Sequence, residues 1–481
     1  MSGRSVDGTA EVGEGFAAPQ DLADPKLKRL ILRLAVPSMA GLCITALHHV
    51  ANAGFVGLLG PEALAAVSVA IPVFALVAAF GHGLGVGTAA TVGRLLGAGA
   101  AGDADRAATT ALGLSVGLGL VASVILLVWQ DQVLALFGAT IGMMPLARDY
   151  VGLLAFSCVL LLLQITCDFI TIAEGNSRFS MWTLLGGFSL NIALDPLLIF
   201  SFDLGIKGAA WATIVSQLAA LAAYAAYFGY RWGRVRVRPS VLTLDWRILR
   251  PMLAVGGPVT LSSGLSATAF ALVFGTASAH GGDAAVAGIG IALRLLTLGM
   301  LPVTGFCLGA QAVLSFAYGA GDLRRVRAAT LFMLRGALGF TLVYSLAMAL
   351  CAGPVVGLFT QDSATAGIAR GALILFHIGF AGAGFQYVLL VLLQAMGKAT
   401  LAGAIGLAPQ GYLLIPLLLV LSQRFGLTGV AMAPAIAIGL TALLSAVVLA
   451  RELAALKRQG HATPPFPPRA DPAVADARGP A

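Results

Sequence analysis

The sequence predicts an all-α integral membrane protein with twelve transmembrane helices, arranged as two parallel repeats of six helices. Three observations support this fold class. Of the 481 residues, 59% are hydrophobic and only 10% are charged, whereas soluble domains carry about 25% charged residues. Apolar runs of about 20 residues, long enough to cross a bilayer, recur between short breaks that are polar or contain Gly or Pro. Short motifs also recur at a nearly constant offset along the chain.

The two ends of the chain differ from the rest in composition. Residues 1–25 are polar and rich in Gly and acidic residues, without the basic-then-apolar pattern of a cleaved signal peptide. Residues 456–481 alternate Pro, Ala and charged residues and cannot bury enough apolar area to become ordered. We therefore expect disordered tails around two lobes: an N-lobe at 26–230, a basic linker at 231–249 and a C-lobe at 250–455.

The expected helices follow the apolar runs in chain order, and each ends where a break begins. The first six span residues 30–56, 64–91, 107–129, 149–172, 180–201 and 207–229. The second six span residues 250–279, 284–314, 327–351, 367–395, 399–421 and 428–450. Each half therefore contains an even number of expected spans.

Basic residues gather in alternate breaks, and this asymmetry predicts the orientation in the membrane. The largest cluster lies between the two halves and comprises Arg231, Arg234, Arg236, Arg238, Arg247 and Arg250. We expect this cluster and both termini to face the cytoplasm, in the plasma (inner) membrane of a bacterium. Topology also explains the net charge of +8, so no nucleic-acid partner is expected. The five cysteines lie in apolar runs at irregular spacing, which indicates neither disulfides nor a metal site.

An internal repeat divides the chain into two halves. Matching pairs in the two halves are Pro37 with Pro258, Gly97 with Gly319, Leu136 with Leu358, and Gly175 with Gly397. Because each half has an even number of spans, both halves start from the same side of the membrane, and the repeats are parallel. This arrangement predicts a path for a solute between the halves.

The order of motifs along the chain is typical of one transporter family. The first half contains LAVPSMAG, FVGLLGPEALAAVSVAIP, GTAATVGRLLGAG and NIALDPLLIF. The second half contains ALRLLTLGMLPVTGF, GAQAVLSFAYGAG and LLQAMGKAT. This succession resembles the multidrug and toxic compound extrusion (MATE) transporters. The resemblance implies alternating access by two six-helix lobes, which export lipophilic or cationic small molecules in exchange for protons or sodium ions. We expect a monomer.

Ionisable residues inside the membrane mark candidate coupling sites, because an unpaired charge in the bilayer is costly. Asp195 lies on the fifth expected helix, and Asn191, one turn earlier, projects from the same face. Pro196 lacks an N–H and frees nearby backbone carbonyls, which could ligate a cation or admit water. Positions matching Asn191, Asp195 and Thr213 line the cation site of the first lobe in MATE transporters. The alternative is that Asp195 only hydrogen-bonds Asn191 and Thr213 as structural residues.

The first expected helix departs from the MATE pattern at one position. Where MATE proteins usually have an aspartate before the FVG segment, this chain has Asn52. A site with one carboxylate should bind sodium more weakly, because hard cations prefer oxygen ligands of matching charge. Proton exchange remains possible there, and sodium at Asp195 stays a second option. His48 and His49 lie one turn before Asn52 and could supply a titrating group, although packing between helices would explain them equally well.

The second half contains no carboxylate at the position that corresponds to Asp195 in the repeat; Leu417 lies near that position. Coupling is therefore expected in the first lobe. Further candidate proton or substrate contacts are Arg294 on the eighth expected helix and, on the tenth, His377, Gln386 and Tyr387. Each of these could instead be a structural polar residue. We expect no cofactor and no metal beyond the coupling ion.

Other classes of function find less support in the sequence. An enzyme would need a phosphate-binding Gly loop, a metal-spaced His/Cys/Glu group or a Ser/His/Asp set, and we identify none. A lipid-linked oligosaccharide flippase of related architecture would favour a more basic cavity, and an exporter of one specific metabolite would fit the pattern as well. A major facilitator transporter would carry a charged loop that GRLLGAGAAGD does not match.

Overall fold

The computed structural model describes residues 19–242 and 245–459, except for the side chains at positions 49, 50, 53 and 239. Most of the two expected tails, 1–25 and 456–481, therefore lies outside the described residues. In the first half the elements are α2 (Leu27–Gly57), α3 (Pro61–Gly97), α4 (Ala101–Val128), α5 (Gln130–Leu136), α6 (Met144–Ala155), α7 (Cys158–Ala173), α8 (Ser177–Pro196), η1 (Leu197–Ser201), α9 (Ile206–Gly229) and η2 (Pro239–Val241). In the second half they are α10 (Trp246–Gly319), α11 (Leu323–Leu350), α12 (Ala352–Gly357), α13 (Ser363–Phe380), α14 (Ala383–Ala395), α15 (Ala399–Leu407) and α16 (Leu414–Gln459).

These elements form the twelve predicted spans. Within the described ranges, nine helices are long and apolar enough to cross a membrane, and the bent pair α6 and α7 adds a tenth span. Two of these ten, α10 and α16, each contain a glycine with non-helical backbone, Gly282 (φ 59°) and Gly426 (φ 55°). The chain reverses at Gly282, because Phe274 lies against Gly290 on the other side of the break. Dividing both helices at these glycines gives twelve spans.

Backbone conformation repeats between the two halves. Glycines with positive φ occur in four pairs, each at nearly the same sequence separation: Gly60 and Gly282, Gly99 and Gly321, Gly175 and Gly397, and Gly205 and Gly426. Residues with a Cβ rarely adopt this conformation, so the paired glycines mark equivalent turns. The internal repeat predicted from sequence motifs is therefore present in the fold.

Three expected helices are broken rather than continuous. The fourth bends by 51° between α6 and α7, where the Ser157 hydroxyl donates to the carbonyl of Leu154 and competes with the helical hydrogen-bond ladder. The tenth divides into α13 and α14 at Gly382. The eleventh divides into α15 and the start of α16, because Pro409 and Gly411 lie between them. Most other helices are a few residues longer than predicted, and α10 begins inside the expected linker.

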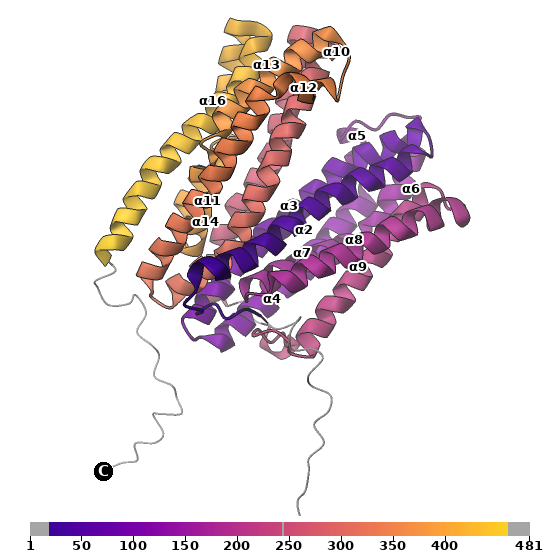
Figure 1. The fold of residues 1–481 in the computed structure, drawn as a ribbon. Coiled ribbons are helices and arrows are strands. Elements are labelled where there is room, and N and C mark those ends of the chain that lie inside the picture. The colour runs from indigo at the N-terminus through magenta and orange to yellow at the C-terminus, as the bar shows by residue number, and fades with distance from the viewer. Residues whose placement is uncertain (1–18, 243–244, 460–481) are drawn as a thin grey trace, which may run out of the picture.

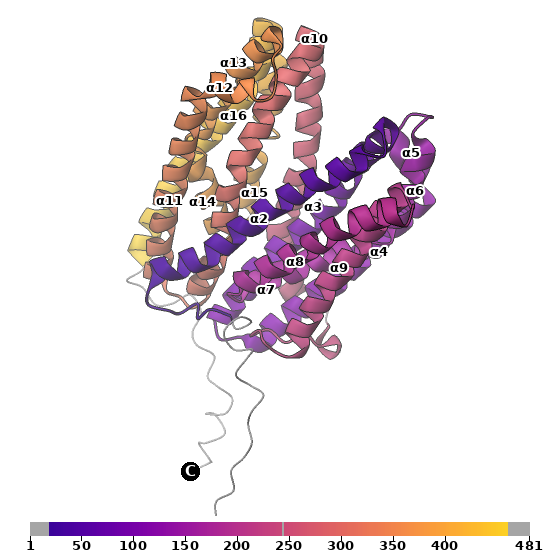
Figure 2. The same ribbon diagram turned by 45° about the vertical axis from the view of Figure 1, so that its right-hand side comes forward.

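Two groups of helices form the molecule. Helices α2–α9 make up the N-lobe and α10–α16 the C-lobe. Figure 1 and Figure 2 show the lobes meeting at the end where α2 begins and α16 finishes, and spreading apart toward the other end. We call the end where they meet the basic end, because the arginine-rich segment between α9 and α10 lies there.

Helices α3 and α10 cross between the lobes with their backbones in contact. A methyl group on Gly87 would overlap the carbonyl of Met252, and one on Gly97 would overlap the carbonyl of Phe316. Membrane helices associate through such small residues because lipid provides no hydrophobic force between them. The α3–α10 crossing therefore depends on glycine at these positions.

The segment before α2, residues 19–26, lies across the basic end and is called the N-terminal strap. The Gln20 amide donates to the carbonyl of Gly175 in the N-lobe at 3.0 Å. Arg325, on α11 of the C-lobe, donates to the carbonyl of Leu22 at 2.8 Å and to two neighbouring carbonyls. The Leu22 side chain is fully buried in the C-lobe core. The strap therefore contacts both lobes.

Candidate functional site

Two polar side chains of α8 are buried inside the N-lobe. Asn191 is 1% exposed and Asp195 is 0% exposed, and their spacing of one turn puts them on the same face. Regular winding ends at Pro196, and the wider turn η1 follows directly. Proline cannot donate to the helical ladder and crowds the preceding turn, so the backbone is rearranged beside Asp195.

Helix α2 brings two polar side chains to face them. Asn52 Nδ2 donates to Asp195 Oδ2 at 3.5 Å, and His48 Nε2 lies 2.7 Å from Asn191 Oδ1. An amide oxygen only accepts, so Nε2 of His48 carries the hydrogen in this contact. The imidazole also stacks on Phe188, with ring centroids 4.3 Å apart. These four residues, His48, Asn52, Asn191 and Asp195, are called the α2–α8 polar cluster.

The cluster retains unused hydrogen-bonding capacity. Asp195 Oδ1 and Asn191 Nδ2 are buried and have no hydrogen-bond partner in the described part of the chain. None of the ion pairs between described residues includes Asp195. The carboxyl group can therefore accept one further hydrogen bond, or carry a proton on Oδ1 and donate it.

The other predicted residues of the N-lobe site behave differently. The Thr213 hydroxyl, on α9, donates to the carbonyl of Ala209 in its own helix at 3.0 Å, so the contacts do not join it to Asp195. Tyr150, on α6, is buried and lies within electrostatic range of Asp195. Nothing in the sequence indicated Tyr150, because its approach to Asp195 depends on how the helices of the N-lobe pack. The side chain of His49 lies outside the described residues.

His377 occupies the interior of the C-lobe. Its ring is 0% exposed, and Nδ1 lies 2.8 Å from the carbonyl of Leu373 on the same helix. Tyr344 packs against it, with ring centroids 5.4 Å apart. Nε2 has no hydrogen-bond partner among the described residues. His377 is therefore held in an aromatic environment, apart from the α2–α8 polar cluster.

The remaining C-lobe candidates lie at separate places. Arg294 on α10 is exposed, and Gln386 on α14 is half-buried. Tyr387 forms a hydrogen bond with Thr304 of α10. The structure does not gather these residues into a second polar cluster.

Arg94 connects the lobes at the basic end, which the sequence did not reveal. This residue of α3 donates from Nη1 to the carbonyls of Gln394 and Ala395, at 3.0 and 3.2 Å. These carbonyls end α14 of the C-lobe, where the helix dipole favours a cation. Because the partners are backbone atoms far away in sequence, no residue pattern could identify them.

Glu174, between α7 and α8, anchors the segment that joins the lobes. Its Oε2 accepts hydrogen bonds from the backbone N–H groups of Arg234 and Val235, at 2.6 and 2.9 Å. The side chain is 0% exposed. Burial raises the pKa of Glu174 to about 7, although hydrogen bonds from both backbone N–H groups and from Tyr227 oppose the shift.

The described residues contain no group of three or more His, Cys, Asp or Glu side chains that could hold a metal ion. The cluster around Asp195 instead offers one carboxyl group, amide groups and an imidazole. These groups suit the binding of a proton or of a weakly held cation.

Comparison with known proteins gives consistent matches. The MatE family model matches residues 37–197 and again residues 258–420, which start at the paired prolines Pro37 and Pro258. The multidrug export protein MepA of Staphylococcus aureus (strain NCTC 8325 / PS 47) is 29% identical over 425 residues, 88% of this chain and 93% of that protein. MepA of Staphylococcus saprophyticus is 26% identical over 423 residues, 87% of this chain and 92% of that protein.

Solved structures show the same fold. A multidrug resistance MATE family transporter of the MOP superfamily, in its outward-facing conformation, gives a TM-score of 0.84 at 27% identity. A MOP superfamily transporter from Pyrococcus furiosus gives 0.83, also at 27% identity. Each match covers 90% of this chain and 97% of the other chain.

Proposed function

This chain belongs to the MatE (MATE) family of transporters, and from that membership we propose that it is a secondary active exporter coupled to protons. It moves lipophilic or cationic compounds by alternating access of the two lobes. The similar MepA proteins are named as multidrug export proteins, which supports a range of small-molecule substrates rather than one metabolite.

The burial and the hydrogen bonding of Asp195 are the observations that support proton coupling. The carboxyl group is fully buried, Asn52 donates to one oxygen, and the other oxygen has no hydrogen-bond partner in the described part of the chain. An ionised carboxylate in this position would lack the compensating cation that burial requires. A protonated carboxyl is neutral and can donate from Oδ1. Exchange of this proton, when one side of the membrane gains access, couples the lobes to the proton gradient.

Sodium coupling is the weaker alternative. A sodium ion needs several oxygen ligands with compensating negative charge. Asn52 directs its amide nitrogen, a donor, at Asp195 Oδ2, so the nearest side chain on α2 offers no second carboxylate. The site therefore suits a proton better than a metal cation.

We further propose that the chain acts as a monomer in the bacterial inner membrane, with the basic end in the cytoplasm. The arginine-rich segment between α9 and α10 supports this orientation. Both described chain ends, at residues 19 and 459, lie at the same end of the bundle (Figure 1).

Transport into vesicles under an imposed gradient tests the coupling. The purified protein, Asp195→Asn and Asp203→Asn are reconstituted, and uptake of a fluorescent lipophilic cation is measured under a pH gradient or a sodium gradient. Asp203 is an exposed residue with positive φ, a conformation that asparagine tolerates, so it provides the same substitution outside the cluster.

We expect the pH gradient to drive uptake by the parent and by Asp203→Asn, whereas Asp195→Asn should fall to the level of protein-free vesicles. Equal proton-driven uptake by all three proteins would disprove the role of Asp195. Uptake driven only by sodium would show that the interpretation of Asn52 is wrong.

A further inference from the structure

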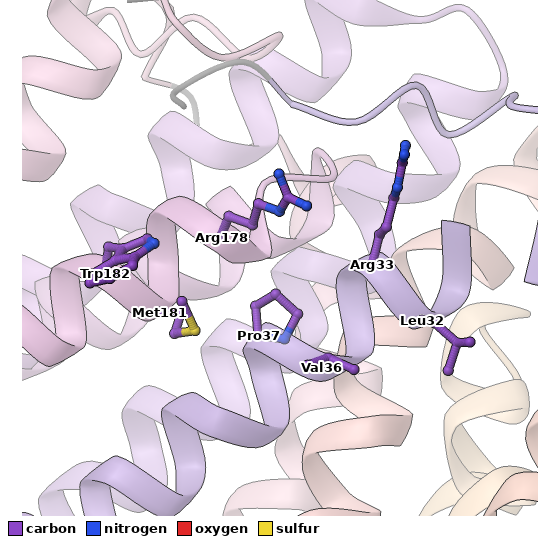
Figure 3. Close-up of a pocket in the computed structure, with 7 residues that line it drawn as sticks. All are labelled: Leu32, Arg33, Val36, Pro37, Arg178, Met181 and Trp182. Carbon is purple, nitrogen blue, oxygen red and sulfur yellow. The ribbon is translucent and has the colours of Figure 1, made fainter. Parts of the chain in front are cut away.

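A groove between α2 and α8 near the basic end combines positive charge with an apolar floor. Its hollow of about 340 Å³ is of the size that small ligands occupy. The residues that line it come from one stripe on each helix: Leu32, Arg33, Val36 and Pro37 of α2, and Arg178, Met181 and Trp182 of α8 (Figure 3). In each helix the lining residues lie on one face, so the side chains of both helices together form the floor and sides of the groove.

The two arginines of the groove form no ion pair with an acidic residue in the part of the chain that the structure describes. Arg33 Nη1 reaches only the amide oxygen of Gln20, at 3.5 Å, and Arg178 forms no hydrogen bond or ion pair with any described residue. The nearby carboxylate of Glu174 is directed at the backbone of Arg234 instead. Figure 3 shows both guanidinium groups rising from neighbouring helices toward the same side of the groove. Among the described residues, no acidic side chain therefore compensates these two positive charges at its mouth.

The rest of the groove is apolar and opens on the outside of the bundle. Leu32, Val36 and Trp182 are 46%, 57% and 47% exposed, on helices that cross the membrane. In a bilayer such surfaces face acyl chains, and tryptophan is enriched at the level of the headgroups. The groove therefore has a cationic part at its mouth and an apolar part beyond it. A phospholipid has the same order of groups, a phosphate followed by acyl chains.

We propose that this groove binds an anionic phospholipid of the leaflet at the basic end. Arg33 and Arg178 hold the phosphate from two sides, as arginine's planar fork suits phosphate oxygens. Trp182 packs beside the glycerol region, and one acyl chain lies along Leu32 and Val36. Basic pockets between membrane helices on the cytoplasmic side have this recognition chemistry. The lipid joins α2 to α8, the two helices that carry the α2–α8 polar cluster.

This binding does not depend on the transported compound or on the coupling ion, so it is tested separately from transport. The full-length protein is placed in nanodiscs of phosphatidylcholine, with or without phosphatidylglycerol that carries brominated acyl chains. Bromine quenches a nearby indole, and comparison with Trp182→Phe isolates the signal of Trp182 from the other four tryptophans. Titration with brominated phosphatidylglycerol then gives its affinity at the groove.

The double variant Arg33→Gln/Arg178→Gln removes the proposed clamp. Arg451→Gln/Arg458→Gln is the matched control, because those exposed arginines flank a hollow of about 390 Å³ on α16 that is lined by alanines and Gln459. At roughly 1 kcal/mol for each basic residue, the groove variant should lose ~30-fold in affinity for phosphatidylglycerol. The control should bind as the parent does. Thermal unfolding in detergent checks that each variant is folded, and Arg178→Lys, which keeps the charge, should lose less than the double variant.

Three results would overturn the proposal. The first is equal quenching by brominated phosphatidylcholine and phosphatidylglycerol in the parent, which indicates contact with bulk lipid. The second is an equal loss of affinity in both double variants, which indicates general charge attraction. The third is displacement of the lipid by soluble glycerol phosphate at similar concentration, which makes the site one for a free phosphate compound.

Discussion

His48 and Asn52 lie one turn apart on α2, and each meets a partner one turn apart on α8. Both pairs can form because residues four positions apart lie on the same face of each helix. The amide of Asn52 donates a hydrogen bond to Asp195, whereas an ionised acid at position 52 would repel the Asp195 carboxylate. The cluster therefore contains a single acidic group. These contacts support the proposal that Asp195 carries the exchangeable proton and that His48 positions Asn191.

Substitutions of His48 distinguish positioning from proton carriage. His48→Gln keeps a donor within reach of Asn191, and we expect proton-driven uptake within about threefold of the parent. His48→Phe keeps the stacking on Phe188 but leaves Asn191 Oδ1 without its donor, which costs about 1–3 kcal/mol. Uptake in vesicles and thermal unfolding measure both effects. Loss of uptake in the Gln variant at normal stability would show that the imidazole itself carries the proton.

Glu174 predicts a pH dependence of stability. Its pKa in the folded protein, about 7, lies above the ordinary value of 4.5, so folding favours the protonated form. The stabilising contribution is complete below pH 4.5 and is lost as the pH rises to about 7. Glu174→Gln keeps an oxygen that accepts from the backbone of Arg234 and avoids burying a charge. We expect a higher unfolding temperature than the parent at pH 8 and little difference at low pH, equivalent to ~3 kcal/mol at most.

The control for this measurement is Glu62→Gln, at an exposed position in the first turn of α3. It measures the effect of replacing a carboxyl group by an amide at an exposed site, at the same two pH values. A parallel shift for Glu174→Gln would mean that folding does not change the pKa of its carboxyl group.

At the scale of elements, several helices of the bundle are irregular. Helix α8 ends at Pro196 in the wider turn η1, directly after Asp195. The fourth, tenth and eleventh spans are each divided into two helices. Breaks of this kind are tolerated in a membrane only where neighbouring helices or cavities satisfy the freed backbone groups. The α3–α10 crossing, by contrast, depends on close backbone contact.

The close α3–α10 crossing predicts that a larger side chain at the crossing lowers the stability of the protein. Gly87→Leu would force α3 away from the Met252 carbonyl, and we expect a loss of about 3 kcal/mol, at the upper end for overpacked sites. Gly339→Leu is the control, because no atom lies within 4 Å of a Cβ at that position of α11. Thermal unfolding in detergent measures both variants. Equal stability of the two variants would show that the lobes do not require close contact here.

At the scale of the whole molecule, several contacts between described residues close the basic end. The α3–α10 crossing brings the lobes together, Arg94 caps α14 across the interface, and Arg325 binds the N-terminal strap. The helices spread apart toward the other end (Figure 2). Under the proposed alternating access, opening of the basic end would separate Arg94 from α14 and the strap from one of the two lobes.

Arg325→Gln should therefore favour opening of the basic end. Its guanidinium makes hydrogen bonds to three strap carbonyls, which glutamine cannot replace. Spin labels at Ala101 and Ala328, both exposed near this end, report the distance between the lobes in a cysteine-free background. We expect a longer-distance population to grow, whereas Arg324→Gln, at an exposed neighbouring position, should leave the distribution unchanged. Identical distributions would show that the strap does not hold the lobes together.

Much of the fold followed from the sequence, because membrane spans have a minimum apolar length and the duplication repeats its glycines and prolines. The structure confirms twelve spans in two repeats, and the family match confirms the resemblance to MATE transporters. The broken spans were missed, since the apolar runs continue on both sides of Ser157, Gly382 and Pro409, where each helix is interrupted only locally. The assignment of Asp195 as the coupling residue stays a prediction.

The sequence by itself determined the class, the duplication and the asymmetry of charge between the two halves, because composition, period and residue identity are local properties. Only the tertiary structure decided which side chains meet. It paired His48 with Asn191, turned Thr213 to its own helix, and placed Arg33 beside Arg178. Such pairings depend on the rotation and crossing of helices, and these are set by the packing of small residues along the whole interface.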